Sequence, residues 1–333
     1  MNNKFQKLAV VLSIVGIVFS CTTDKTESIS PDSQTKTIEN TTTQARATTT
    51  KKFLFDAIKA ENAGNADWII SENSSGTPLR FPNPSISTVT ASTPETYWQG
   101  ALSAWGIALV KQGHTVESIV SGGRITYGDA SNAQDLSNYD VYVVDEPNIL
   151  FTSSEKTAIL NFVKNGGGLF MISDHNISDR NNDGKDSPAI WNDFMQNNTV
   201  QTNPFGFTVE LTNFSQTSTN ILSNSSTNPI LNGSLGKVTQ LKFNNGASIK
   251  INKTANTSAT GLIWQNSVSQ TSTTKIMCAS ATYFSGRVVL ISDSSPADDG
   301  TAKPGKNVFP GWTDVSGNHA RLHMNASLWL AKL

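Results

Sequence analysis

The sequence predicts a single α/β domain, a mostly parallel sheet with helices on both faces. Three observations predict it. Apolar runs without polar alternation recur at 141–144, 168–172 and 288–291, which is typical of strands buried on both faces. Amphipathic, helix-like segments separate these runs. Hydrophobic residues make up 37% of the 333 residues, enough for a substantial core.

The first elements alternate between strand and helix. The run KKFLFDA at 51–57 predicts a first strand that ends in Asp56. Residues 94–113 predict a helix that starts at a proline, spaces its apolar residues helically and ends at a glycine. TVESIV at 115–120 and YDVYVVDEP at 139–147 are the next two predicted strands.

The second half repeats the pattern around a different middle segment. SSEKTAILNFVKNGGG at 153–168 predicts a serine-capped helix that stops at glycines, and GLFMISDH at 168–175 predicts a strand. GRVVLISDSSP at 286–296 predicts another strand, and 319–333 a final amphipathic helix. Between them, 203–274 consists of short Thr/Asn/Ser-rich pieces, interpreted as strands inserted into or extending the main sheet.

Acidic side chains follow the predicted strands at their carboxyl ends. Right-handed crossovers place these ends on one edge of the sheet, where α/β proteins bind ligands. Each acid alone could cap the following helix, but acids at four strand ends favour a site. The catalytic candidates are Asp174, His175, Asp56, Glu61 and Asp293.

Composition and charge narrow the class of protein. The chain has 25 Lys plus Arg against 26 Asp plus Glu, a net charge of −1, so we expect no sequence-independent binding to a nucleic-acid backbone. With 2 cysteines the chain is no disulfide scaffold. We infer no protein partner from the sequence.

The N-terminus predicts export. Lys4 and Lys7 precede a short apolar run that ends at Cys21, a secretory signal that resembles the bacterial lipobox. Residues 1–21 are therefore interpreted as a lipoprotein signal peptide, and the Thr-rich 22–50 as a disordered tether before the folded domain at 51–333. We expect a lipid anchor on Cys21, at the outer membrane or cell surface, as the only membrane contact. An ordinary signal peptide with a chance cysteine is the alternative.

The segment FVKNGGGLFMISDHN at 162–176 resembles the strand-and-turn element of the class I glutamine amidotransferase-like superfamily, particularly its ThuA-like branch. FLFDA, VYVVDEP and the segment after 287 extend the resemblance over most of 51–333. It implies a flavodoxin-like sheet and hints at carbohydrate use. Amidotransferases place a cysteine at the turn, whereas this chain has Ser173, Asp174 and His175. The resemblance therefore implies fold more than reaction.

The segment SDRNNDGKD at 178–186 predicts a calcium-binding loop. Asp179, Asn181 and Asp183 alternate before Gly184, and such a loop turns alternate oxygen ligands inward. The expected calcium ligands are Asp179, Asn181, Asp183, Lys185, Asp186 and Ser187. A metal-free turn is the alternative, because Asp, Asn and Gly all favour turns.

The expected function is a surface-anchored hydrolase acting on an extracellular glycan or another polymer. Its acidic pocket would also suit another divalent metal that activates water. Substrate-binding candidates are Asn65, Glu146, Asn148, Trp191, Asp299 and His319. The alternative is a non-catalytic glycan-binding or ligand-binding lipoprotein that kept the fold without the cysteine.

Overall fold

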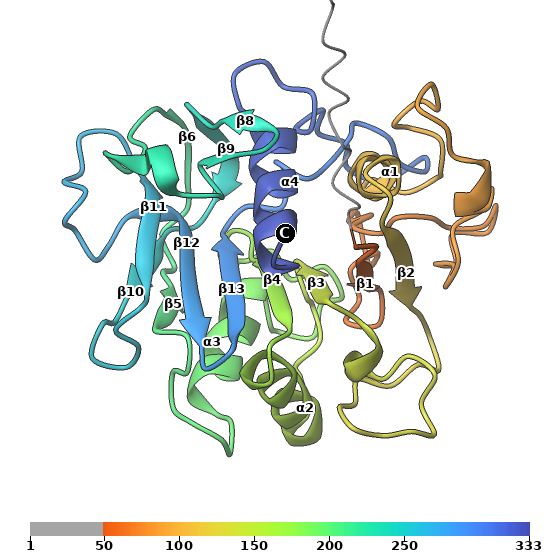
Figure 1. The fold of residues 1–333 in the computed structure, drawn as a ribbon, viewed down its shortest axis with the longest axis horizontal. Coiled ribbons are helices and arrows are strands. Elements are labelled where there is room, and N and C mark those ends of the chain that lie inside the picture. The colour runs from red at the N-terminus through yellow and green to blue at the C-terminus, as the bar shows by residue number, and fades with distance from the viewer. Residues whose placement is uncertain (1–48) are drawn as a thin grey trace, which may run out of the picture. The chain divides into compact units, whose positions relative to one another are not determined.

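The computed structural model describes residues 49–333, and the predicted signal peptide, Cys21 and almost all of the tether lie outside the described residues. Its centre is a nine-stranded mixed sheet (Figure 1). The main path of the sheet has the order β2-β1-β3-β4-β13-β12-β10-β5, and β11 also pairs with β12. In that order the bounds are Thr115–Ile119, Lys52–Asp56, Val141–Asp145, Gly168–Ile172, Gly286–Ile291, Ile276–Tyr283, Ile249–Ile251 and Phe207–Val209, with β11 at Thr260–Trp264.

Five neighbouring strands of this sheet are parallel. β1 pairs in parallel with β2 and β3, β3 with β4, and β4 with β13. β12 is antiparallel to β13, and the strands beyond it are antiparallel as well. The parallel part has the strand order of a flavodoxin-like fold. The predicted α/β fold class is confirmed.

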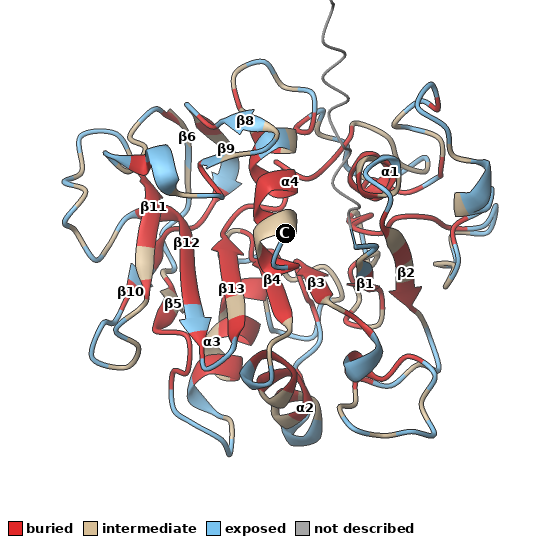
Figure 2. Ribbon diagram, in the orientation of Figure 1, coloured by how far each residue is buried: buried red, intermediate tan, exposed pale blue. Residues whose placement is uncertain are grey.

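Four helices cover the two faces of the sheet. Their bounds are α1 Ser103–Lys111, α2 Ser153–Lys164, α3 Ser187–Gln196 and α4 His319–Leu330. α1 and α4 pack on the face that carries Phe53 and Phe170, whereas α2 and α3 pack on the face that carries Leu54 and Leu169. Successive strand residues enter opposite cores because strand side chains alternate. The central strands are accordingly buried throughout (Figure 2).

Two helix starts differ from the sequence prediction. The predicted helix over 94–113 begins only at Ser103, because the Ser103 hydroxyl instead binds the loop through Trp98 N and the Glu95 carbonyl. Helix α2 is capped not by a serine but by Thr152, which forms a reciprocal capping box with Glu155. Both differences are local, and the helices occupy their predicted places in the chain order.

The segment 203–274 supplies strands to three sheets. β5, β10 and β11 join the main sheet, whereas β6 (Phe214–Ser218) pairs with β9 (Leu241–Gly246). β7 (Asn232–Gly233) and β8 (Gly236–Lys237) form a short ribbon. The end of β9 lies close to the residues that follow β13. A Cβ atom added to Gly246 would lie only 2.6 Å from the Asp293 Cβ. A side chain at position 246 would push the two apart.

Candidate functional site

The parallel strands end in acids on one edge of the sheet. β1 ends in Asp56 and β3 in Asp145, and Glu146 follows at once; Asp174 and Asp293 stand two residues beyond β4 and β13. All five carboxyl side chains are buried. The acids expected at this edge from the sequence therefore do lie there, but they divide into distinct environments.

A small hollow of about 190 Å³ lies at this edge. It is framed by residues after β4 and β13, by the end of β9 and by the loop before α4. Its lining is Asp174, His175, Arg180, Asn244, Asn245, Asp293, Ser294, Ser295, Asn307 and Phe309. Three of the predicted catalytic residues, Asp174, His175 and Asp293, thus share one cavity.

His175 and Asp174 form a pair in the wall of the hollow. His175 Nδ1 lies 2.8 Å from the Asn176 carbonyl oxygen, which can only accept, so Nδ1 carries the hydrogen. His175 Nε2 then faces Asp174 Oδ2 at 3.5 Å. Desolvation, followed by the charges of Glu146 and Asp293, raises the pKa of Asp174 well above its usual range. The Asp174 carboxyl group is thus placed beside an imidazole nitrogen.

Arg180 ties two of the buried acids together. Its Nε donates to Glu146 Oε1 at 2.6 Å and its Nη2 to Asp174 Oδ2 at 2.8 Å. Asn65 Oδ1 accepts from Nη1 at 3.1 Å, and Asn148 Oδ1 accepts from the Arg180 backbone N–H at 2.8 Å. Asn65 and Asn148, predicted to bind substrate, do not line the hollow but hold Arg180 in place.

Glu146 occupies a strained turn directly after β3. Its φ is +46°, in the left-handed region that non-glycine residues rarely adopt. Its carboxylate also accepts from the Trp68 indole and from Ser294 Oγ, the latter at 2.9 Å. Such backbone outliers cluster at functional sites. The resemblance places the sharp turn after β4, whereas the left-handed residue stands after β3, the neighbouring strand.

Asp293 closes the hollow from the side of β13. Its Oδ1 accepts from Ser295 N at 2.9 Å and from Ser295 Oγ at 2.7 Å, and its Oδ2 accepts from Asn244 N. Desolvation by burial raises the pKa of Asp293 to about 6. The carboxyl group thereby fixes the end of β9 against β13 and positions two lining residues.

Asp56 and Glu61, predicted as catalytic, do not line the hollow. Asp56 Oδ1 accepts from Ile58 N and Lys59 N at 2.8 and 2.9 Å, and Tyr142 OH donates to its Oδ2. Burial and the nearby Asp56 charge raise the pKa of Glu61 well above its usual range. Both carboxyls are engaged in the turn after β1, because an Asp at a strand end readily accepts from the next backbone amides. Their predicted place in the reacting site is not supported by this geometry.

Three predicted substrate-binding residues have other surroundings. Trp191 is 1% exposed and donates to the Ile172 carbonyl, so it is core rather than rim. Asp299 accepts from Ala104 N at 3.0 Å, at the start of α1. His319 lines a neighbouring hollow, where its Nδ1 bonds the Gly311 carbonyl and its Nε2 accepts from the Lys242 backbone amide. Burial lowers the pKa of His319 and favours its neutral ring.

The predicted calcium loop is a tightly bonded turn. Asp179 accepts from Asp183 N and Gly184 N, at 3.1 and 2.7 Å, and Asn181 Nδ2 lies 3.1 Å from Asp183 Oδ2. These three side chains are thus brought together. The other three predicted ligands differ: Lys185 is exposed, Ser187 is buried beside Ser173, and Asp186 caps α3 through Ala189 N at 2.9 Å.

Two further acids, Asp67 and Asp145, are buried, and their carboxyl oxygens accept no hydrogen bond within residues 49–333. Desolvation raises the pKa of Asp67 to about 7 and that of Asp298 to about 8, and it raises the Asp145 pKa well above its usual range. Within the same residues, no group of three or more His, Cys, Asp or Glu side chains is arranged to hold a metal ion.

Several site residues escape sequence reasoning. Arg180 is the exception, because a cation directly after Asp179, in a loop rich in Asp and Asn, can be noticed in the sequence. Asn244, Asn245, Asn307 and Phe309 come from segments far from β4 in the chain. Polar residues of this kind are common in loops, so no local pattern marks them.

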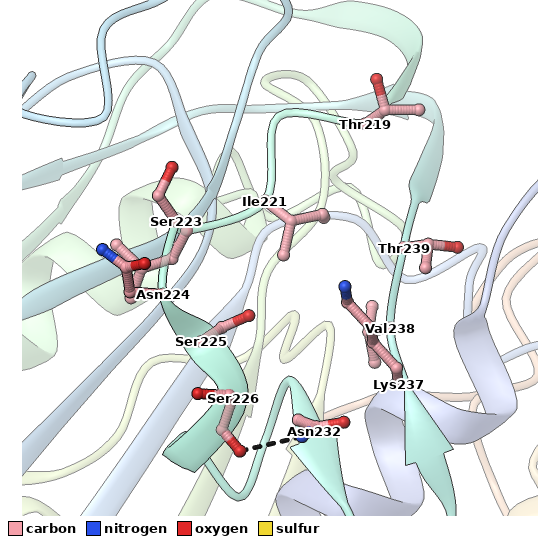
Figure 3. A pocket seen from close by; sticks show the side chains of 11 residues that line it. Thr219, Ile221, Ser223, Asn224, Ser225, Ser226, Asn232, Lys237, Val238 and Thr239 are labelled. Carbon is pink, nitrogen blue, oxygen red and sulfur yellow. Dashed lines mark hydrogen bonds between the residues drawn. The ribbon is translucent and has the colours of Figure 1, made fainter.

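A larger hollow lies elsewhere. It measures about 480 Å³ and is lined by residues between Thr219 and Thr239 (Figure 3). Hydroxyl and amide side chains predominate around a small apolar floor, and Lys237 is its charged member. Ser226 accepts from Asn232 Nδ2 at 2.8 Å through its carbonyl oxygen. This hollow contains neither acid nor histidine, so the edge of the main sheet is the better candidate for chemistry.

Cys278 is fully buried in β12, and burial raises the pKa of its thiol, so it is a core side chain. Over residues 49–333, no helix has the length and apolar character needed to cross a bilayer.

No family model matches the chain, and no curated protein matches it. Solved structures with similar folds include a ThuA-like protein from Bacteroides uniformis, at 12% identity, 84% coverage of this chain, 91% of that one and a TM-score of 0.43. Another from Parabacteroides merdae has 12% identity, 85% and 90% coverage and a TM-score of 0.43. The mmIFT52 N-terminal domain has 10% identity, 84% and 97% coverage and a TM-score of 0.47. These likenesses concern the fold alone.

Proposed function

We propose that the chain is an exported hydrolase that acts on a neutral, hydroxyl-rich polymer such as a glycan. The observation that carries the proposal is the pair of His175 Nε2 and Asp174 Oδ2, 3.5 Å apart in the wall of a hollow. The hollow lies at the edge where α/β sheets bind ligands. Imidazole is also the side chain whose charge changes near neutral pH.

His175 is the proton-transfer group of this proposal. In hydrolysis, the oxygen of a water molecule bonds to the substrate carbon and passes a proton to His175 Nε2. The leaving oxygen takes this proton from His175 Nε2 as its bond to carbon breaks, which returns the imidazole to its neutral form. Asp174 positions the imidazole and stabilises its charged form, and Arg180 holds Asp174.

The lining indicates a neutral substrate. Asn244, Asn245 and Ser295 offer uncharged donors and acceptors, and Phe309 offers an aromatic face. Arg180 is already paired with two carboxylates, so the lining of this hollow offers no unpaired cation to an anionic group. Hydroxyl groups and a ring face are the features that such a wall recognises.

The test is a turnover screen on neutral polysaccharides, esters and nucleic acids with wild type and His175→Ala. We expect the variant to lose about 10²- to 10⁴-fold in rate. Its melting temperature should stay near wild type, because His175 is only partly buried. Lys237→Ala, in the larger hollow, is the matched control and should keep full activity. Equal, negligible turnover in all three proteins would reject the hydrolase.

Such a result would favour the second candidate, a non-catalytic glycan-binding protein. One observation favours it: Ser173, at the turn where amidotransferases carry their cysteine, is fully buried and its hydroxyl lies 3.5 Å from Ser187 Oγ. No exposed nucleophile therefore follows β4 at that position.

We also propose a lipid anchor on Cys21 and calcium in the loop of Asp179, Asn181 and Asp183. The anchor rests on the apolar run before Cys21, and the measurement is fatty-acid labelling, which Cys21→Ser should abolish. Calcium is supported by the meeting of three oxygen-bearing side chains in one turn. Oxygen ligands suit calcium.

A further inference from the structure

A second hollow adjoins the candidate site. It measures about 180 Å³ and lies between the end of β9 and the start of α4. Asn244, Ser295 and Phe309 line both hollows. The two hollows are therefore neighbouring parts of one groove, and these three residues form the wall between them.

The second hollow exposes more apolar than polar surface, and its one ion pair leaves no unpaired charge in it. Lys242 Nζ lies 2.7 Å from Asp314 Oδ2, so these two charges offset one another. Both ring nitrogens of His319 are already bonded to the backbone. The second hollow thus resembles the first, because both combine a mainly apolar lining with charges that are held in pairs.

The wall between the hollows is held in place by buried acids. Phe309 N donates to Asp298 Oδ2 at 2.7 Å, and Asn244 N and Ser295 N both donate to Asp293. Burial raises the pKa of Asp298 and of Asp293. The ring of Phe309, fixed between the two hollows, thus contributes to the apolar lining of both.

Size decides how much of a chain each hollow accepts. Drug-sized ligands occupy pockets of about 300–1,000 Å³, so hollows of about 190 and 180 Å³ are each too small for one. Each has room for one small unit, and the pair for two in succession. A chain of small polar units fits this groove better than a single large ligand.

We infer that the groove binds two consecutive units of a neutral, hydroxyl-rich chain, an oligosaccharide, with one unit on each side of Phe309. The inference rests on the proposed function for the class of ligand and adds the second subsite. Anionic units are excluded because Asp174 and Asp293 face the first hollow. The unit in the first hollow is the one beside His175.

The test uses defined ladders of neutral gluco-, manno- and xylo-oligosaccharides of one to four units, with an oligogalacturonate ladder as the anionic probe. Binding is measured by calorimetry and by protein NMR shifts. For at least one neutral ladder, we expect the dimer to bind about tenfold tighter than the monomer, with little gain beyond it. The anionic ladder should not bind.

Lys242→Trp should fill the second hollow, because Lys242 lines it and its side chain is 40% exposed. The dimer should then bind no tighter than the monomer, while monomer affinity stays unchanged. Lys242→Gln, which removes the charge without adding bulk, is the matched control and should keep the tenfold ratio. A ratio that survives in Lys242→Trp, or that is absent in wild type, overturns the second subsite.

The outcomes separate this inference from the hydrolase. Hydrolysis of an ester without binding of any ladder would leave the hydrolase standing and overturn the two-unit groove. Length-dependent binding with no turnover would support the groove and reject the hydrolase. His175→Ala should keep the length preference, because His175 does not line the second hollow.

Discussion

The edge of the parallel sheet and the β-rich segment differ in the polar groups they bury and in how these groups are hydrogen-bonded. At the edge, carboxyl groups such as Asp145 and Asp67 are buried without partners, and Arg180 is shared between two acids. In the β-rich segment, neutral amides such as Asn220 and Asn266 bind loop carbonyls, for example Asn220 Nδ2 to the Gln265 carbonyl at 2.9 Å. The two regions belong to one folded chain, yet only one of them contains charges withdrawn from water.

This difference shows that volume alone is a poor guide to chemistry. The β-rich segment has the larger hollow, about 480 Å³ against about 190 Å³. A neutral hydrogen bond contributes roughly 1 kcal/mol to stability, whereas an uncompensated buried charge costs several. Burying carboxyl groups at a sheet edge without hydrogen bonds, as for Asp145, raises their pKa and gives up stability there. We therefore look for function at the edge.

Removing Arg180 should produce the largest effect. Arg180→Ala leaves Glu146 and Asp174 buried without their cation, and breaking a buried ion pair costs about 3–5 kcal/mol. Urea unfolding at pH 7 measures the loss. Acidification to pH 5 should shrink it, because the Asp174 pKa is raised and this carboxyl then takes up a proton.

The matched control for Arg180 lies in the β-rich segment. Lys237→Ala removes an exposed cation that is not engaged in an ion pair among the described residues, and such surface changes stay within about 0.5 kcal/mol. Unfolding of both variants at the same urea concentration would contradict the contrast between the two regions.

Calcium should produce the second effect. If the loop of Asp179, Asn181 and Asp183 binds the ion, calcium at 100 times its Kd adds about 2.7 kcal/mol to the free energy of unfolding. Thermal unfolding in calcium and in excess chelator measures it. Asp183→Ala should abolish the shift. Asp129→Ala, in another turn where Asp129 accepts from Ser131 N, should keep it. A wild-type melting temperature that is the same with ion and with chelator would show a metal-free turn.

The third effect is a slope of the unfolding free energy with pH. Burial raises the pKa of Asp298 to about 8, of Asp67 to about 7 and of Asp293 to about 6. The folded state therefore holds protons that the unfolded state has released, and stability falls as pH rises from about 4 to 8. The chain should be more stable at pH 5 than at pH 8.5. Each proton contributes at most about 1.4 kcal/mol per pH unit.

Asp298→Asn tests which acid produces this slope. It should flatten the dependence of unfolding free energy on pH between 6 and 9, whatever its effect on absolute stability. Asp314→Asn is the control, because hydrogen bonding to Lys242 lowers the pKa of Asp314. A steep slope in Asp298→Asn, equal to that of wild type, would assign the protons to other groups.

Much of the fold could be predicted because its signals are local. The strand ending in Asp56 and the strand before Asp174 are apolar runs, and their burial on both faces follows from composition. The site was predicted in part for the same reason, since acids at parallel strand ends share an edge. The predictions that the geometry does not support have a common cause. Trp191 and Glu61 belong to patterns that fit a core or a turn as well as a site.

By itself, the sequence determined the alternation of the parallel strands with α1, α2 and α4, the acids at the strand ends and the turn after Asp179, because propensity and capping act over a few residues. It did not predict α3. Only the tertiary structure decided which acids became partners. Arg180 reaches Glu146 across 34 positions, and Asn244 meets Asp293 across 49. It also decided that Phe309 stands between two hollows. Such contacts depend on how distant segments pack, and packing is set by the whole core.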